Sequence, residues 1–140
     1  MFKAIPYFVF QDANAAIAYY EENFDAKLLS KQTAEDPAFD DMDSMIENRA
    51  EFIMHATIEI MGQQFYISTS WGNKPTPNED TSVALVFDEN DDQAVEAAKA
   101  FFDKASSTGS DVQPFGEAPW TKYFGSFNDR FGVNWMVSGM

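Results

Sequence analysis

The chain has 140 residues, no cysteine and a formal net charge of -14, from 9 Lys and Arg against 23 Asp and Glu. Nucleic acids and anionic membranes are bound through clustered Lys and Arg, so this balance excludes both kinds of partner. The lack of cysteine excludes disulfides, zinc–thiolate sites and a thiol nucleophile. The hydrophobic content of 45% predicts a folded domain with a real core.

The N-terminal segment is not typical of a targeting sequence. Lys3 is its only basic residue before Asp12, which interrupts the apolar run early. The segment therefore predicts neither a signal peptide nor a membrane span, and we expect a cytoplasmic location.

The first half of the chain opens with a predicted strand and helix. Residues 5–10, IPYFVF, form an aromatic-rich apolar run in which a proline is tolerated near the start. Asp12 or Asn14 follows, and either side chain can accept a hydrogen bond from a free N–H of a first helical turn. Apolar residues at helical spacing then form one stripe: Ile17, Tyr20 and Phe24.

Three more strands are predicted in this half, at residues 27–34, 51–60 and 63–70. The last two are joined by a tight turn that contains Gly62. Residues 71–80, WGNKPTPNED, contain Gly, Pro and Asn and predict a linker.

After this linker the same pattern starts again. Residues 81–87 predict a strand, and a helix capped by Asp91 or Asp92 extends to about Ser106. The apolar stripe of this helix consists of Val95, Ala98, Phe102 and Ala105. Three strands follow, at residues 111–115, 122–128 and 133–138.

The order of elements is therefore βαβββ, repeated once, in an α+β fold. We expect a single domain of two modules, about residues 1–70 and 81–140, joined by the linker 71–80. One helix cannot cover both faces of four strands, so each module leaves one sheet face uncovered. Two such modules can curve into a partly open, eight-stranded, barrel-like sheet around a cavity, with the helices outside.

Three stretches of the chain are similar to a known family. They are PYFVFQDANAAIAYYEENFDAKLL near the start, MHATIEIMG in the middle and APWTKYFGSFNDRFGVNWMVS near the end. Together with the repeated βαβββ order, they resemble the vicinal oxygen chelate superfamily, which includes glyoxalase I, fosfomycin-resistance proteins and extradiol dioxygenases, and within it the PhnB-like branch. The chain departs from the family at Asp25–Ala26, where glycine is usual, and at Met61, which looks like an insertion in the hairpin turn.

The resemblance also implies where a metal would bind. Metal-using members hold a divalent ion on four His, Gln or Glu ligands from the opening and closing strands of both modules. The matching positions here are Ile5, Thr81, Met136, and Ser68 or Ser70. None of these offers the carboxylate or imidazole that such an ion needs, so we expect no metal and no other cofactor.

Two features offer chemistry of their own. His55, the only histidine, is a candidate general base or hydrogen-bond donor in the cavity, although a half-buried strand histidine without chemistry also fits. The acidic run at residues 36–47 suggests a calcium loop, with Asp41, Asp43 and Glu47 as ligands. It lacks the glycine and spacing of an EF-hand, so a solvated loop is the better interpretation.

Aromatic and strand residues complete the candidate ligand-binding set. Trp120, Tyr123 and Phe124 lie in the stretch most similar to the family and can form an aromatic wall, or simply pack in the core. Strand alternation places Tyr7, Asn134 and Met136 on the cavity side. The full candidate ligand-binding set is Tyr7, His55, Ser70, Trp120, Tyr123, Phe124, Asn134 and Met136.

No motif identifies a reaction. A nucleophile-elbow pattern, a glycine-rich phosphate loop and an adenosylmethionine loop are all missing from the sequence. We therefore expect a metal-free domain that binds a small apolar or aromatic molecule. The alternatives are a metal-independent enzyme that uses His55 and hydroxyl groups, and an enzyme that recruits a metal through other residues. The resemblance also implies a homodimer.

Overall fold

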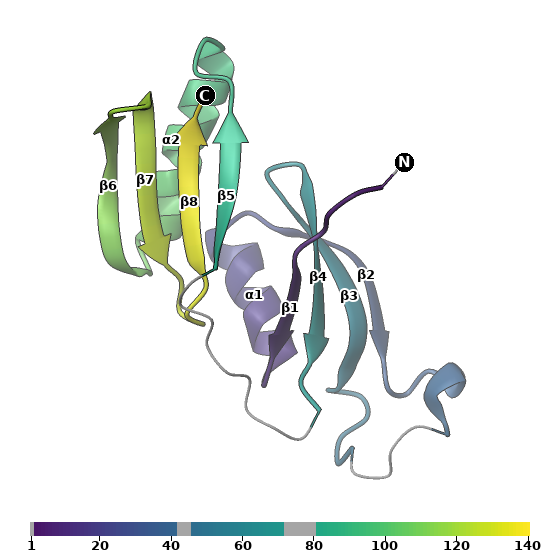
Figure 1. The fold of residues 1–140 in the computed structure, drawn as a ribbon. Coiled ribbons are helices and arrows are strands. Elements are labelled where there is room, and N and C mark those ends of the chain that lie inside the picture. The colour runs from purple at the N-terminus through teal and green to yellow at the C-terminus, as the bar shows by residue number, and fades with distance from the viewer. Residues whose placement is uncertain (1, 42–45, 72–80) are drawn as a thin grey trace. The chain divides into compact units, whose positions relative to one another are not determined.

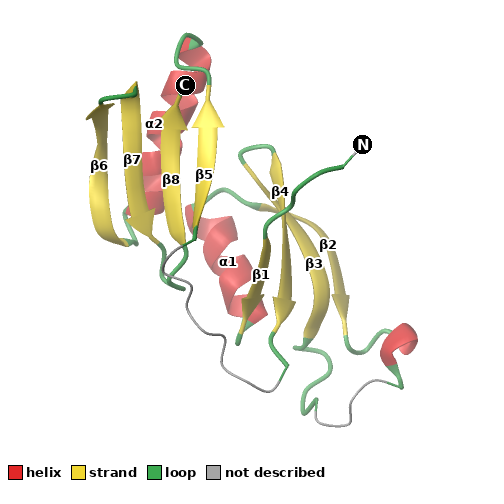
Figure 2. Cartoon of the chain, in the orientation of Figure 1, coloured by secondary structure: helices red, strands yellow, loops and turns green. Residues whose placement is uncertain are grey.

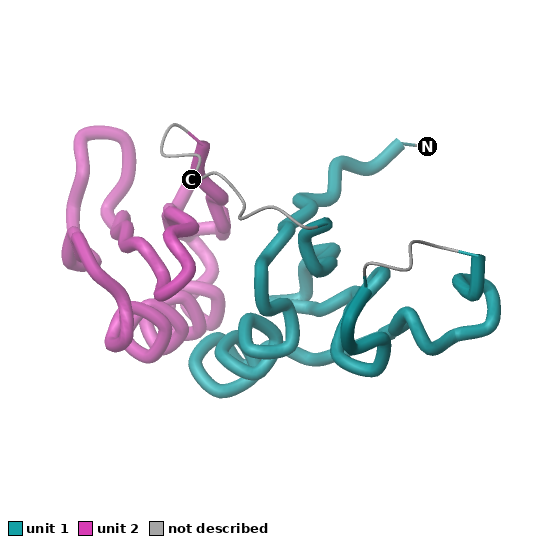
Figure 3. Tube along the Cα trace, turned by 90° about the horizontal axis from the view of Figure 1, so that it is seen from below, with its two compact units in different colours: residues 1–76 teal, residues 77–140 magenta. Residues whose placement is uncertain are grey.

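The computed structural model describes residues 2–41, 46–71 and 81–140, and the chain forms two compact units, residues 1–76 and 77–140 (Figure 3). The boundary between the units falls within the predicted linker 71–80, of which residues 72–80 lie outside the described residues. In the described part of the chain, neither α-helix is long and apolar enough to cross a membrane.

Unit 1 has the predicted order of elements (Figure 1). These are β1 (Tyr7–Phe10), α1 (Ala13–Asn23), β2 (Lys27–Thr33), the short 3-10 helix η1 (Pro37–Phe39), β3 (Ile53–Ile60) and β4 (Gln63–Thr69). The sheet order is β1-β4-β3-β2, in which β1 pairs with β4 in parallel and the other pairs are antiparallel. Helix α1 packs against one face of this sheet.

Unit 2 repeats this plan (Figure 2). It contains β5 (Ser82–Phe87), α2 (Asp92–Ser106), β6 (Ser110–Ala118), β7 (Thr121–Asn128) and β8 (Asn134–Gly139). The sheet order β5-β8-β7-β6 matches that of unit 1, with β5 parallel to β8. The α+β fold of two βαβββ repeats is therefore confirmed, and the eight strands found among the described residues form two four-stranded sheets.

The predicted helix starts are confirmed, and the structure chooses between the alternatives. Asp12 caps α1, because its carboxylate accepts a hydrogen bond from the backbone N–H of Ala15 at 3.0 Å. Asp91 caps α2 in the same way and accepts from two backbone N–H groups. Every residue of both predicted apolar stripes is buried.

The predicted strands differ from those in the structure by one to three residues at their ends, and the strand predicted at 111–115 differs most. The first strand begins at Tyr7 rather than at residue 5, although the carbonyl of Pro6 still accepts a hydrogen bond from the N–H of Tyr66. The strand predicted at 111–115 extends from Ser110 to Ala118, through Pro114. A proline fits there because β6 is an edge strand with an irregular register, where a missing N–H costs no hydrogen bond.

The acidic run is partly described. Asp36 caps η1, since its carboxylate accepts a hydrogen bond from the N–H of Ala38 at 2.9 Å. Asp43, one of the calcium ligands considered, lies outside the described residues. No group of three His, Cys, Asp or Glu that could hold a metal ion is found within the described ranges.

Candidate functional site

Each sheet has a helix-covered face and an opposite face, here called the open face. In β1, Phe8 and Phe10 point toward the helix side, where Phe10 packs against Tyr20 with ring centroids 6.2 Å apart. Tyr7 and Val9 alternate with them and are 50% and 43% exposed. The parity predicted for Tyr7 therefore matches its position on the open face.

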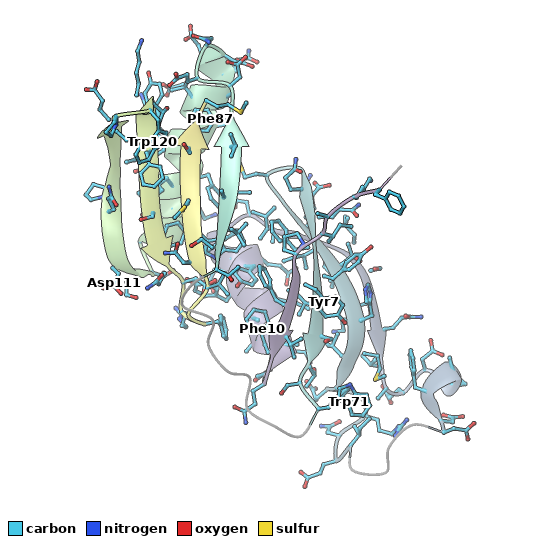
Figure 4. All side chains as sticks on the ribbon, viewed as in Figure 1. Tyr7, Phe10, Trp71, Phe87, Asp111 and Trp120 are labelled. Atoms are coloured by element: carbon cyan, nitrogen blue, oxygen red, sulfur yellow. The ribbon has the colours of Figure 1, made fainter. Side chains whose placement is uncertain are left out.

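Three aromatic rings meet on the open face of unit 1. Tyr7 from β1, His55 from β3 and Tyr66 from β4 form what we call the ring cluster (Tyr7 is labelled in Figure 4). The centroid of Tyr7 lies 6.0 Å from that of His55 and 6.0 Å from that of Tyr66. His55 and Tyr66 are 4.6 Å apart, and the three interplanar angles are 75°, 83° and 62°.

Backbone pairing fixes this arrangement. Tyr7 pairs directly with Tyr66 across the parallel β1–β4 ladder, and Tyr66 pairs with Thr57 across the β3–β4 ladder. His55 lies two residues from Thr57 along β3, on the same face of the sheet. The register therefore brings together side chains that are far apart in the sequence.

The polar atoms of the ring cluster have no partners in the described part of the chain. No described residue forms a hydrogen bond with the imidazole of His55 or with the hydroxyl groups of Tyr7 and Tyr66. None of these polar groups is buried without a partner.

Ser70 lies just after β4, beyond the ring cluster. Its backbone N–H donates to the carbonyl of Phe10 at 2.9 Å and so extends the β1–β4 pairing by one residue. It has the same strand parity as Tyr66 and Ser68, and it is half-buried.

The aromatic candidates of unit 2 divide between the two faces. Phe124 lies on the open face and packs against Trp120, with ring centroids 5.2 Å apart and Trp120 64% exposed. Tyr123 points to the helix side instead, where it contacts Phe87 and Phe115. Neighbouring residues of a strand alternate in direction, so Tyr123 and Phe124 cannot share one wall. We therefore leave Tyr123 out of the proposed site.

Asn134 lies on the open face of unit 2 within a chain of hydrogen bonds that we call the polar ladder. Ser82 Oγ donates to Asn134 Oδ1 at 2.6 Å, and Asn134 Nδ2 donates to Asn128 Oδ1 at 2.8 Å. Asn128 Nδ2 then donates to Asp111 Oδ2 at 3.1 Å. The amide of Asn134 therefore already bonds to neighbouring strands, which indicates a structural role.

Met136 shares the open face of unit 2 with Asn134 and lies between the ladder and the aromatic pair. It is half-buried and pairs with Ser126 on β7 and Ala84 on β5. Asp111 and Trp120 mark opposite ends of this sheet in Figure 4. The open face of unit 2 is thus polar at one end and aromatic at the other.

The positions that would hold a metal carry no strong ligands. Ile5 precedes β1 and Thr81 precedes β5, whereas Ser68 and Met136 lie on open faces. An aliphatic side chain, two hydroxyl groups and a thioether do not match the oxygen and imidazole donors that a hard or borderline divalent ion prefers. The residues present therefore do not fit the metal of the superfamily.

Tyr66 was missing from the predicted site, although its signal is in the sequence. Within the predicted strand 63–70, Phe65 and Ile67 form the apolar side, and Tyr66 alternates with them. The same parity rule that selected Tyr7 would have placed Tyr66 on the open face.

The geometry agrees with comparisons to known proteins. The sequence model of the glyoxalase/bleomycin resistance protein/dioxygenase superfamily matches residues 7–137. The chain belongs to this superfamily. The resemblance of the sequence to the vicinal oxygen chelate proteins is thereby confirmed.

Individual relatives match over nearly the whole chain. Protein YjdN of Escherichia coli strain K12 is 29% identical over 141 residues, which cover 95% of this chain and 92% of YjdN. Protein PA1353 of Pseudomonas aeruginosa has a similar fold, with a TM-score of 0.73, 25% identity, and coverage of 99% of this chain and 98% of PA1353. The PhnB protein of Bacillus cereus aligns with a TM-score of 0.64, 22% identity and coverage of 99% and 100%.

Proposed function

We propose that this protein binds a small, flat, apolar or aromatic molecule on the open face of unit 1, without a metal. The observation that carries the proposal is the ring cluster of Tyr7, His55 and Tyr66. Its rings meet on the face that α1 does not cover, and their polar atoms bond to no other described residue.

Aromatic side chains suit this task for two reasons. They offer a large apolar surface with few rotatable bonds, so little conformational entropy is lost when a ligand orders them. Their hydroxyl and imidazole groups can also form hydrogen bonds that orient a ligand. The ring cluster provides both kinds of contact from three different strands.

The metal-free part of the proposal depends on residue chemistry. Ile5, Thr81 and Met136 occupy three of the positions at which the superfamily's metal ligands would lie, and they cannot replace His or Glu there. Binding would then depend on contact with the rings, and a chelator would leave the affinity unchanged.

The first experiment measures indole binding by NMR, with protein selectively labelled in its Tyr and His rings. We expect saturable shifts of the ring-cluster resonances. Substitution Tyr7→Ser removes one ring and should weaken indole binding about five-fold, the scale of one aromatic contact.

Phe2→Ser is the matched control. It also replaces an aromatic ring with Ser, but Phe2 is 103% exposed and is not part of the ring cluster. Equal loss of affinity in both variants, or indole shifts that avoid the ring cluster, would disprove the proposed site.

An enzymatic role for His55 is the second candidate. Its imidazole is half-buried beside Tyr66 and bonds to no other described residue, so it can exchange a proton with a molecule bound there. If a substrate is found, His55→Ala should abolish turnover, whereas indole should still bind, only about five-fold more weakly, as after the removal of one ring in Tyr7→Ser. Unchanged turnover in that variant would rule out this role.

The remaining expectations stay predictions. They are the enclosure of the open faces in a cavity, assembly as a homodimer and a cytoplasmic location. Sedimentation velocity at several concentrations would measure the assembly state, and a monomer at every concentration would contradict the homodimer.

A further inference from the structure

The rings of the ring cluster lie close together at steep angles to one another. Its three ring planes are inclined to one another at 62–83°, and the centroids are 4.6–6.0 Å apart. One position above the cluster can therefore lie within about 6 Å of all three centroids, the range of a cation–π contact. The π faces of aromatic rings carry partial negative charge and attract cations that hold little water.

Unit 2 contains a tyrosine that already has such a contact. Lys99 of α2 places its Nζ 5.4 Å from the ring centroid of Tyr123. For the ring cluster, by contrast, the described residues supply no cation over any ring.

Three of the basic side chains of unit 1 form ion pairs or hydrogen bonds with residues outside the ring cluster. Lys27 lies 4.0 Å from Glu59, and Lys31 donates to Asn14 Oδ1. The guanidinium of Arg49 donates to the carbonyls of Ala34 and Phe39. Each of these three cations therefore has a partner other than the ring cluster.

The charge of the molecule favours the same kind of ligand. Residues 1–76 contain 12 Asp and Glu but only 5 Lys and Arg, and the whole chain has a net charge of -14. Such a field attracts cations and repels anions on approach. The negative field and the rings act together, since each disfavours a carboxylate or phosphate ligand.

We infer that the ring cluster selects a small organic cation, with a quaternary ammonium or similarly alkylated head. A metal ion is a poor occupant, because the rings offer π faces rather than the oxygen ligands that a hard cation requires. This inference rests on the proposed function and specifies the class of ligand for the same site.

The test compares two molecules of equal shape, choline and 3,3-dimethylbutan-1-ol, which differ by one positive charge. Binding is followed through the labelled Tyr and His rings in about 150 mM salt, which screens long-range attraction. The pH is about 8, above the range in which histidine usually gains a proton. We expect choline to bind at least about five-fold more tightly than the neutral alcohol.

Two substitutions at Tyr7 locate the effect. Tyr7→Leu removes the ring but keeps an apolar side chain, and it should lower the preference for choline by about three-fold or more. Tyr7→Phe keeps the ring and loses only the hydroxyl group, so it should retain the preference. Because Tyr7 is half-exposed, both variants should fold.

Equal binding of choline and the neutral alcohol would overturn the inference, as would choline shifts spread over the acidic surface. Titration of indole into the same samples distinguishes failure of the inference from failure of the proposed function. If indole binds and choline shows no preference, the inference fails but the proposed function stands. If neither binds at the ring cluster, both fail.

Discussion

The two units share one fold, but the polar groups of their open faces differ in their hydrogen bonding. In unit 2, Ser82, Asn134, Asn128 and Asp111 bond to one another across the sheet. In unit 1, the ring cluster presents its imidazole and hydroxyl groups without any such partner in the described residues. Polar groups that pair with each other hold strands together, whereas unpaired groups are available to a ligand.

The β3–β4 hairpin of unit 1 and the β7–β8 hairpin of unit 2 also differ in their side-chain hydrogen bonds. In unit 1, the β3–β4 turn is made by the backbone alone, with Met61 at φ 51° and Gly62 at φ 76°. In unit 2, the β7–β8 turn is organised by Asp129, which is only 4% exposed. Its carboxylate accepts hydrogen bonds from the N–H groups of Phe131 and Val133 and from the indole of Trp135. The turn of unit 2 also contains a left-handed residue, Gly132 at φ 84°, but side-chain hydrogen bonds support it in addition.

The largest expected effect comes from removing the support in unit 2. Asp129→Ala removes a carboxylate that accepts hydrogen bonds from three donors, among them the indole N–H of Trp135, a residue that is 0% exposed. An unpaired buried donor costs about 1–3 kcal/mol, so we expect a loss of about 3 kcal/mol or more in the free energy of unfolding. Equilibrium unfolding in urea measures this quantity.

Asp103→Ala is the control for this prediction. Asp103 is an exposed residue of α2, and its removal should change the free energy of unfolding by no more than about 0.5 kcal/mol. If the two variants were equally stable, the hairpin of unit 2 would not depend on its buried carboxylate, and the contrast with unit 1 would be lost.

A smaller effect is expected at the turn of unit 1. Met61 is 45% exposed and has a left-handed backbone, which costs a residue with a Cβ about 1 kcal/mol. Asparagine adopts this conformation more readily and is favoured in two-residue hairpin turns. Met61→Asn should therefore raise the free energy of unfolding by about 0.5 kcal/mol. A decrease in the same urea experiment would show that the Met61 side chain stabilises the turn.

The smallest effect is a pH dependence in unit 2. The pKa of Glu89 is lowered from its ordinary value of 4.5, first because Thr121 Oγ1 donates to its carboxylate at 2.7 Å and next because the N–H of Lys122 also donates. A lowered pKa in the folded state stabilises the fold above about pH 4.5, and this contribution is lost as the pH falls through the folded value. Thr121→Val should therefore flatten the dependence of stability on pH below 4.5.

Glu89→Gln provides the matched comparison, because it removes the titrating group itself. Both variants should show a shallower decline between pH 5 and pH 3 than the unmodified protein, a window around the ordinary carboxyl pKa. An unchanged decline in both would mean that other carboxyl groups control acid unfolding.

Most of the fold could be predicted because it depends on local patterns. Helix caps such as Asp12 and apolar stripes at helical spacing act within a few residues, so the sequence alone locates both helices. The full length of β6 could not be predicted, because Gly116 usually weakens a strand and belongs to β6 through its pairing with Phe124 on β7. This pairing is a property of the assembled sheet.

The candidate site was harder to predict, because it depends on strand pairing. Parity placed Tyr7, Asn134 and Met136 on open faces, but it could not show that Tyr7 pairs with Tyr66. Tyr123 was assigned by its neighbourhood in the sequence, although alternation turns it toward α2. Likewise, only the register reveals that Asn134 is already bonded to its neighbours.

Native mass spectrometry of protein purified gently and without chelators tests the central claim most directly, because it detects bound molecules and metals in one spectrum. The proposal predicts a chain that carries an organic mass and no metal, with the organic mass lost in Tyr7→Ser and kept in Phe2→Ser. One divalent ion retained per chain, with no organic mass that depends on Tyr7, would contradict metal-free binding at the ring cluster.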